Sequence, residues 1–211
     1  MVFIMHCCEK IKFFLFGLVC VLTCAVFPAH ATDIAVDDAQ LVADENDGYS
    51  LTTNFTINLG SRLEEIVNRG VSLYFVTDFE LTRSRWYWFD EKVVRRSRTI
   101  QLSYHALTRQ FRLSSGTLHQ SFSTLREALS VLSRLRQWPV IEKNEIDADT
   151  LYQASVRLRL DPSLMPKTFQ VNALSDKELS QSSEWLHWDF SVHEADAPTT
   201  STPVQEGVGP Q

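Results

Sequence analysis

The segment from Val71 to Thr82 constrains the fold most, because its apolar side chains recur at every second residue. The odd-numbered positions carry mostly valine, leucine and phenylalanine, whereas Ser72, Asp78 and Glu80 stand at even positions. A period of two places these sets on opposite faces of a strand, so we expect a half-buried β-strand. The extended pattern continues to position 89 and can turn back at 90–92 into a second strand over 93–104, which predicts a long hairpin.

Further strand and helix signals surround this hairpin. Extended segments at 34–42 and 49–59 flank an Asp-Gly turn and predict an earlier hairpin. Ser61 and Thr124 each precede a glutamate by three residues, as in a helix capping box, so we expect two helices, over about 61–69 and 124–137. Other short strands are expected near 111–113, 117–120, 152–160 and 185–190. Adjacent strands joined by short turns favour an α+β domain with a predominantly antiparallel sheet, arranged in hairpins and a meander.

The N-terminus has the pattern of an export signal. Residues 13–27 form an uncharged apolar run that follows Lys10 and Lys12 and precedes the cleavage pattern Ala29-His30-Ala31. The run is shorter than the roughly 20 residues that a helix needs to cross a bilayer. We therefore expect a cleaved signal peptide over 1–31 and a periplasmic protein without a stable membrane span. An uncleaved membrane anchor is the alternative.

The expected mature chain has no cysteine, because all four cysteines lie in the signal segment. Disulfides and thiolate chemistry are therefore excluded from it, and lipidation at Cys24 is disfavoured because no small residue precedes it. Its net charge of −7 argues against nucleic acid as a partner. We expect a single globular domain over 32–193 and a disordered tail over 194–211, where no large apolar side chain beyond valine occurs.

Several stretches together resemble a known family. They are VSLYFVTDFELTRSRWYWFDEK (71–92), SYHALTRQFRL (103–113), SxGxLHQxFxxLxEAL (114–129) and PKxFQVNAL (166–174). Over about residues 36–191 the chain is similar to an uncharacterised exported family of proteobacteria, the domain of unknown function numbered 4390. The resemblance implies a bacterial envelope protein of one domain, encoded near a membrane sensor kinase, and it carries no catalytic residues or cofactor.

No residue set in the sequence defines a reaction. The histidines of the mature chain, at positions 105, 119, 187 and 193, lack the spacing of metal ligands, so we expect no metal site and no cofactor. His119 could serve as a base near Ser114 or Ser115, but no G-x-S-x-G turn surrounds either serine. The acidic cluster at 44–48 lacks both end ligands of a calcium loop.

Two carboxylates form a further candidate. Asp78 and Glu80 lie two residues apart on one expected strand and so share a face, as a general acid and base would require. The favoured interpretation is a solvated strand face whose carboxylates pair with an arginine across the hairpin.

The expected hairpin is rich in arginine and tryptophan. Positions 83–112 hold eight basic and two acidic residues, a local charge of +6 in an acidic chain. Arginine and tryptophan dominate protein interface hot spots, which makes part of this set a candidate for partner binding. In the alternative, the two tryptophans are core residues that arginines cover by cation–π stacking. The candidate residues are Arg83, Arg85, Trp86, Trp88, Arg96 and Arg98.

Three functional hypotheses follow from these features. The first is a non-catalytic periplasmic module that binds another envelope or membrane protein, such as the extracytoplasmic part of a sensor kinase, through the arginine and aromatic hairpin. The second is a carrier of a small apolar or lipid-like ligand between sheet and helix. The third is an enzyme of unidentified class.

Overall fold

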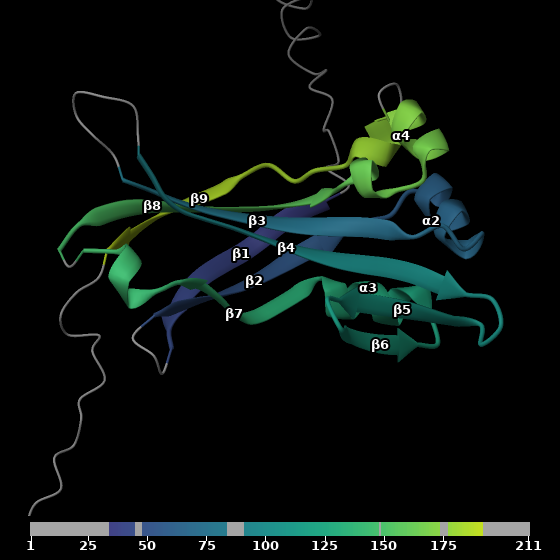
Figure 1. Cartoon of the computed structure of the whole chain (residues 1–211), viewed down its shortest axis with the longest axis horizontal. Coiled ribbons are helices and arrows are strands. Elements are labelled where there is room, and N and C mark those ends of the chain that lie inside the picture. Colours follow the sequence, from purple (N-terminus) through teal and green to yellow (C-terminus); the bar gives the residue numbers. More distant parts are fainter. Residues whose placement is uncertain (1–33, 45–47, 84–90, 148, 174–176, 192–211) are drawn as a thin grey trace, which may run out of the picture. The chain divides into compact units, whose positions relative to one another are not determined.

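The computed structural model describes residues 34–44, 48–83, 91–147, 149–173 and 177–191, and these residues form two antiparallel sheets with helices (Figure 1). The three-stranded sheet has the order β1-β2-β7, and the six-stranded sheet has the order β6-β5-β4-β3-β8-β9. Every pairing between neighbouring strands is antiparallel. The expected α+β fold with a mostly antiparallel sheet is confirmed.

The three-stranded sheet begins with the earlier of the two predicted hairpins. Its strands are β1 (Ile34–Ala43), β2 (Tyr49–Ile57) and β7 (Arg134–Ile141). The Asp44 amide donates to the Gly48 carbonyl at 2.9 Å, and the Gly48 amide donates back to the Asp44 carboxylate at 3.0 Å. A Cβ atom at Gly48 would lie only 2.6 Å from the Ile141 carbonyl oxygen, so this glycine lets β1–β2 approach β7 closely.

The first helix, α2 (Ser61–Asn68), follows β2 as predicted, but its start differs from the prediction. Gly60 is the N-cap and no side chain caps the helix, so the Ser61 capping box is wrong. Ser61 already lies inside the first turn, where its hydroxyl cannot reach back to the free amides. Gly70 adopts the left-handed conformation expected after the helix, with φ of +86°.

The six-stranded sheet contains the long predicted hairpin at its centre. Its strands are β3 (Leu73–Arg83), β4 (Glu91–His105), β5 (Gln110–Ser115), β6 (Leu118–Phe122), β8 (Leu151–Leu160) and β9 (Leu186–Ser191). The expectation that β3 is half-buried is wrong, because its even-numbered face also lies out of solvent: Val76 is 3% exposed and Asp78 2%. The tip of the hairpin, 84–90, lies outside the described residues.

The second helix, α3 (Leu125–Leu132), has the predicted capping box. The Thr124 hydroxyl accepts from the Glu127 amide at 3.2 Å, and the Glu127 carboxylate accepts from the Thr124 amide at 3.3 Å. The predicted extension to residue 137 is wrong, because the chain enters β7 at Arg134. Pairing with β2 replaces further helical hydrogen bonds, beginning with the Phe55 amide, which donates to the Ser133 carbonyl at 2.8 Å.

The strands near 152–160 and 185–190 are confirmed as β8 and β9, while four short helical elements after β7 were not predicted. Those elements are η1 (Lys143–Glu145), η2 (Pro162–Leu164), α4 (Lys167–Ala173) and η3 (Lys177–Ser180). The predicted signal peptide over 1–31 and the tail over 194–211 lie outside the described residues. Within the described ranges, no helix combines the length and the apolarity that crossing a membrane would require.

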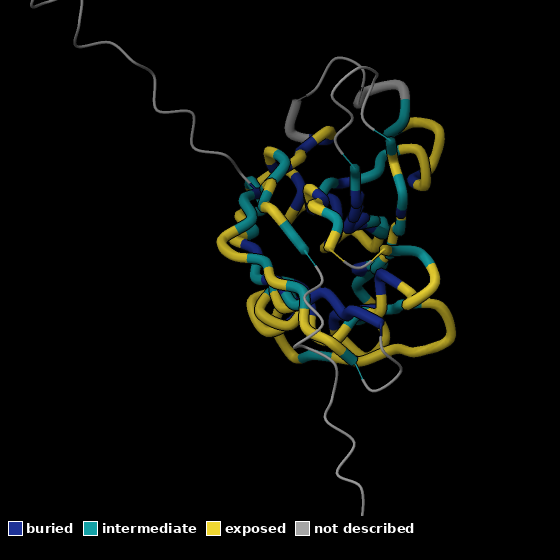
Figure 2. The backbone as a smooth tube through the Cα atoms, turned by 90° about the vertical axis from the view of Figure 1, so that its left-hand side faces the viewer, coloured by how far each residue is buried: buried dark blue, intermediate teal, exposed yellow. Residues whose placement is uncertain are grey.

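One hydrophobic core joins the two sheets and the helices. The tube in Figure 2 shows buried segments inside and exposed segments around them. Leu51 and Phe55 of β2 belong to the same buried cluster as Phe75 and Phe79 of β3 and Leu132 of α3. The odd-numbered face of β3 points into this core, where the three-stranded sheet and the helices cover it. The opposite face of β3 carries a polar network.

Candidate functional site

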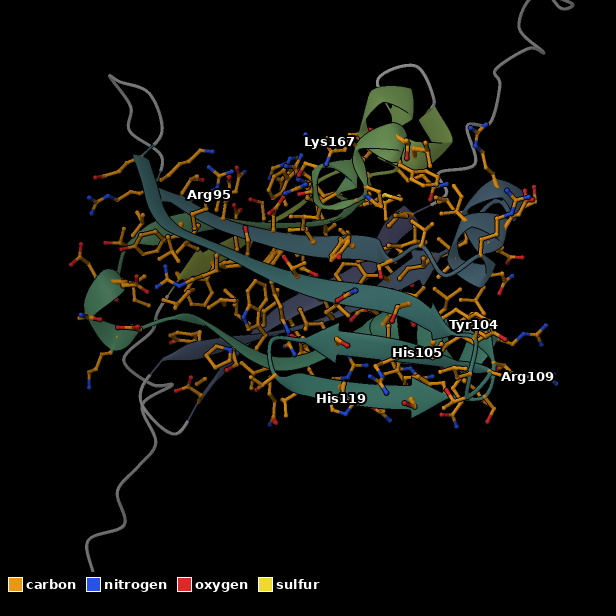
Figure 3. The ribbon with its side chains drawn as sticks, turned by 45° about the vertical axis from the view of Figure 1, so that its right-hand side comes forward. Arg95, Tyr104, His105, Arg109, His119 and Lys167 are labelled. Atoms are coloured by element: carbon orange, nitrogen blue, oxygen red, sulfur yellow. The ribbon has the colours of Figure 1, made fainter. Side chains whose placement is uncertain are left out.

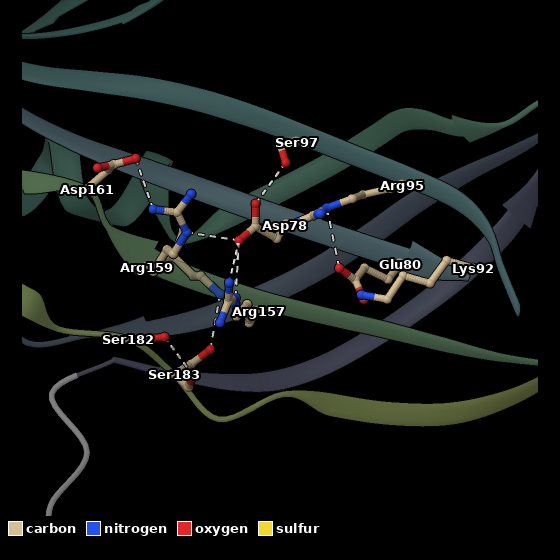
Figure 4. Close-up of polar contacts among 11 residues, drawn as sticks. Asp78, Glu80, Lys92, Arg95, Ser97, Arg157, Arg159, Asp161, Ser182 and Ser183 are labelled. Carbon is tan, nitrogen blue, oxygen red and sulfur yellow. Dashed lines mark hydrogen bonds and ion pairs between the residues drawn. The ribbon is translucent and has the colours of Figure 1, made fainter. Parts of the chain in front are cut away.

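Asp78 is the centre of a polar network on the second face of β3 (Figure 4). Its carboxylate accepts hydrogen bonds from the Ser97 hydroxyl at 2.8 Å, from Arg157 Nε at 3.1 Å and from Arg159 Nε at 2.9 Å. Burial by itself would raise the pKa of Asp78, but the hydrogen bonds from Ser97 and the two arginines hold this pKa below its usual value. Asp78 is therefore ionised at neutral pH.

The neighbouring carboxylate and arginine extend this network. Glu80 accepts from Lys92 Nζ at 2.7 Å and lies 3.4 Å from Arg95 Nε, and both partners come from β4. Arg159 also donates to Asp161 at 2.9 Å, and the Arg157 guanidinium stacks 4.5 Å from the Trp185 ring centroid.

The geometry gives Asp78 and Glu80 a structural role. The prediction that they share a face is confirmed by their common orientation, while the expected solvated face is wrong because they are 2% and 9% exposed. The lowered pKa of Asp78 favours its ionised form, which has no proton to donate as a general acid. Both carboxylates are matched by cations on the flanking strands β4 and β8, as in a buried ion-pair network.

The histidines that the structure describes do not converge on one site. Figure 3 labels His105 and His119 on different strands, β4 and β6, and His187 lies on β9. The β5–β6 register places Ser114 opposite His119, but Ser114 is only half-buried and His119 is exposed. No group of metal-ligating side chains is present among the described residues. His193 lies outside those residues.

Two of the predicted arginines make ion pairs within the domain. Arg83 donates to Glu91 at 2.7 Å and to Asp147 at 3.1 Å, and the Glu91 hydrogen bond raises the pKa of the Arg83 guanidinium. Arg96 donates to Glu145 at 2.6 Å. Their charges are therefore partly balanced before any partner binds. Arg85, Trp86 and Trp88 lie outside the described residues.

Arg98 lies in a different setting, at a cleft that we call the arginine cleft. This cleft of about 370 Å³ lies between the β4–β5–β6 part of the large sheet and the α3–β7 segment. Ile100, Leu113, Leu118 and Val131 contribute apolar side chains to it. Its cationic residues are Arg98, Arg134 and Arg136.

The charge of the arginine cleft is not balanced by its own lining. Arg136 donates to the Thr53 carbonyl at 3.1 Å and to the Asn54 side-chain oxygen at 2.6 Å, both of which are neutral. Among the described residues, no carboxylate lines the cleft and none pairs with Arg98 or Arg134. Three guanidinium groups next to exposed apolar side chains suit an anionic group with apolar neighbours.

Sequence reasoning found Arg98 and missed the other two arginines. The helix predicted over 124–137 places Arg134 and Arg136 in its last turn, where they would point in different directions. The available signal was the alternation of Arg134, Leu135 and Arg136, which places both arginines on one side of a strand and the buried leucine on the other.

A second hollow lies between the helices, and we call it the helix groove. Its volume is about 600 Å³, and Phe55, Leu59, Leu125 and Leu129 supply apolar surface to it. Glu64, Asn68, Arg126 and Ser130 add polar groups. The volume falls in the range of small-molecule sites, and the groove is open to solvent.

Comparison with known families covers most of the chain. A family model described as "Domain of unknown function (DUF4390)" matches residues 31–189. No curated protein and no solved structure matches the chain.

Proposed function

The chain belongs to the DUF4390 family, and we propose that it is a non-catalytic interaction module of the bacterial periplasm that binds another envelope protein through the arginine cleft. The observation that carries this proposal is the set of three arginines around apolar side chains, with no carboxylate among the described residues that line the cleft. The expected partner is an acidic surface of a membrane or envelope protein, such as the extracytoplasmic part of a sensor kinase.

The arginines differ in whether they already pair with a carboxylate. Arg83 and Arg96 already hold carboxylates of their own domain, so a partner would have to compete with them. Arg98 and Arg134 face no such competition among the described residues. Guanidinium groups bind carboxylates through two parallel hydrogen bonds, which gives both affinity and orientation.

Exposed apolar side chains support the same location. Leu118 is 75% exposed and Val131 is 42% exposed, and both line the arginine cleft. Burial of these side chains by a partner would remove apolar surface from water next to the charged contacts. Apolar contacts of this kind would exclude water from the arginine contacts, as the contacts around interface hot spots do.

The periplasmic location of this module rests on the N-terminal pattern. The charged start, the apolar run over 13–27 and the Ala-His-Ala pattern suit an exported chain. The lack of cysteine after residue 31 means that the mature domain needs no disulfide in an oxidising compartment.

Charge reversal in the arginine cleft tests the proposal. The double variant Arg98→Glu and Arg134→Glu should leave the melting transition almost unchanged, because neither side chain pairs with a carboxylate among the described residues. It should weaken capture of envelope proteins by about tenfold or more and reduce the salt dependence of capture. Capture is measured with the immobilised mature domain and envelope extract, and the affinity is then measured with each purified partner.

The matched control reverses a charge elsewhere on the same sheet. Arg109 lies in the exposed turn between β4 and β5 and does not line the arginine cleft (Figure 3). Arg109→Glu should leave the affinity within about twofold of the wild type. Equal binding by the cleft variant and the wild type, or equal loss in both variants, would refute the cleft as the binding site.

A second candidate function is supported by the helix groove. Its volume of about 600 Å³ and its apolar residues suit a small apolar or lipid-like ligand, which a carrier would hold there. Ser130 lines the groove and is exposed, so Ser130→Trp should fill it without disturbing the core. A fluorescent fatty acid should bind the wild type saturably and this variant weakly; equal binding by both would exclude the groove as a carrier site.

A further inference from the structure

We infer that the partner of the arginine cleft is an extended acidic segment of another protein, which adds a strand to the free edge of β6. This inference rests on the proposed function and specifies how the same cleft binds. In this mode of recognition, main-chain hydrogen bonds hold the segment and alternate side chains provide specificity.

The edge at β6 is open in the described part of the chain. β6 is the last strand on its side of the six-stranded sheet and pairs only with β5 there. In an antiparallel pair, alternate residues of an edge strand direct N–H and C=O groups away from their neighbour. The sequence Leu-His-Gln-Ser-Phe contains neither the proline nor the lysine that often protects an edge.

The other edges are less suited to an acidic strand. β7 contains Pro139, which has no N–H to donate, and Gln137 has a left-handed φ of 47° that breaks the regular edge. β1 carries the exposed Asp37 and Asp38 next to a register shift, and β9 carries the exposed Asp189. These carboxylates would repel an acidic segment.

The side chains next to the β6 edge complement such a segment. Leu118 of β6 and Val131 of α3 are exposed and line the cleft, together with Arg134 at the start of β7. A strand added beside β6 would direct alternate side chains toward this layer. Apolar residues would cover Leu118 and Val131, and carboxylates would reach Arg134 and its neighbouring arginines.

Charge also selects between a foreign segment and a second copy of this chain. Pairing of β6 with β6 of another copy would bring two arginine clefts close together without carboxylates to separate them. Like charges that face each other across an interface repel and weaken the association strongly. An acidic segment of a different protein avoids this repulsion and supplies the missing counter-charges.

The test uses synthetic peptides of about seven residues, long enough to span β6, with alternating valine and glutamate. Two further peptides carry N-methyl groups on alternate residues, one on the odd and one on the even positions. An added strand turns only one of these sets of N–H groups toward β6. We therefore expect one methylated peptide to bind about tenfold or more weakly than the parent and the other to bind like the parent.

The remaining measurements separate failure of this inference from failure of the proposed function. Equal affinity of both methylated peptides, or no binding of the parent peptide, would overturn strand addition. The proposed function would then depend only on the affinity of the charge-reversal variant for envelope partners. Parent-peptide affinity that is unchanged by Arg98→Glu and Arg134→Glu would count against the cleft itself. A dimer without peptide, detected by sedimentation and lost in Ser121→Pro, would identify a second copy as the occupant and overturn the inference.

Discussion

Replacement of Asp78 by asparagine tests the polar network on β3 directly. The change keeps the size of the side chain and removes the charge that Arg157 and Arg159 surround at 3.1 and 2.9 Å. Removing one partner of a buried ion pair costs about 3 to 5 kcal/mol, because the other charges remain in the interior. Both arginines keep roughly a third of their exposure to water, which screens part of this cost, so we expect Asp78→Asn to lower the free energy of unfolding by about 2 to 4 kcal/mol.

The effect should depend on pH in a defined direction. The pKa of Asp78 in the folded state lies below its ordinary value, because hydrogen bonds from Ser97 and the arginines outweigh the opposing effect of burial. The stability that the ionised carboxylate contributes is therefore complete above a pH of about 4 and is lost as the pH falls through the lowered folded pKa. The difference between wild type and Asp78→Asn should shrink at acidic pH.

Urea unfolding monitored by tryptophan fluorescence measures this difference at pH 7 and at several values below 5. Asp189→Asn provides the control, because it makes the same chemical change at an exposed position of β9 and should shift stability by less than about 0.5 kcal/mol. A loss below about 1 kcal/mol for Asp78→Asn, or a loss that stays constant down to acidic pH, would refute the assigned network.

Three other predictions concern the helices and the N-terminus. Leu132→Ala should lower the free energy of unfolding by about 2 to 5 kcal/mol, because Leu132 is only 4% exposed. Leu129→Ala should lower it less, because Leu129 is only partly buried. Equal losses in thermal or urea unfolding would contradict the observed face of α3. Thr124→Ala should cost about 0.5 to 2 kcal/mol through loss of the N-cap, whereas Ser61→Ala should be nearly neutral, since Gly60 occupies that position in α2. N-terminal sequencing of protein purified from the cell envelope should give Thr32 as the first residue, and recovery of the intact segment 13–27 in membranes would instead establish an anchor.

The strands could be predicted where their pattern was local. The position of β3, the hairpin of β1 and β2 and the Thr124 capping box each depend on neighbouring residues, and the structure contains all three features. The end of α3 depends instead on Thr53 and Phe55, which lie some 80 positions away and pair with β7 and Ser133. Tertiary pairing of this kind overrides helix propensity, and a single sequence does not reveal it.

The same reason limited the prediction of the site. The local pattern predicts that Asp78 is an exposed residue of a half-buried strand. The arginines that pack against its carboxylate belong to β8, far along the chain, so the local pattern does not reveal them. The arginine cleft combines Arg98 of β4 with Arg134 and Arg136 of β7. Their proximity follows from the packing of the two sheets, so the local charge of the hairpin indicated only Arg98 of the three. It also indicated Arg96, whose partner Glu145 lies 49 residues away in the sequence.

The pairing of β2 with β7 and of β3 with β8 also governs how the chain can acquire its structure. Thr53 pairs with Leu135, and Phe79 pairs with Val156. Neither sheet can therefore be completed before segments that are synthesised much later are available. Folding rates fall as contacting residues lie further apart in sequence, which makes slow refolding the expectation for this topology. A chain released only as far as α3 would have no partner for one side of β2 and of β3. For the export that we propose, this delay would keep the leading part of the chain unfolded until β7 and β8 have emerged.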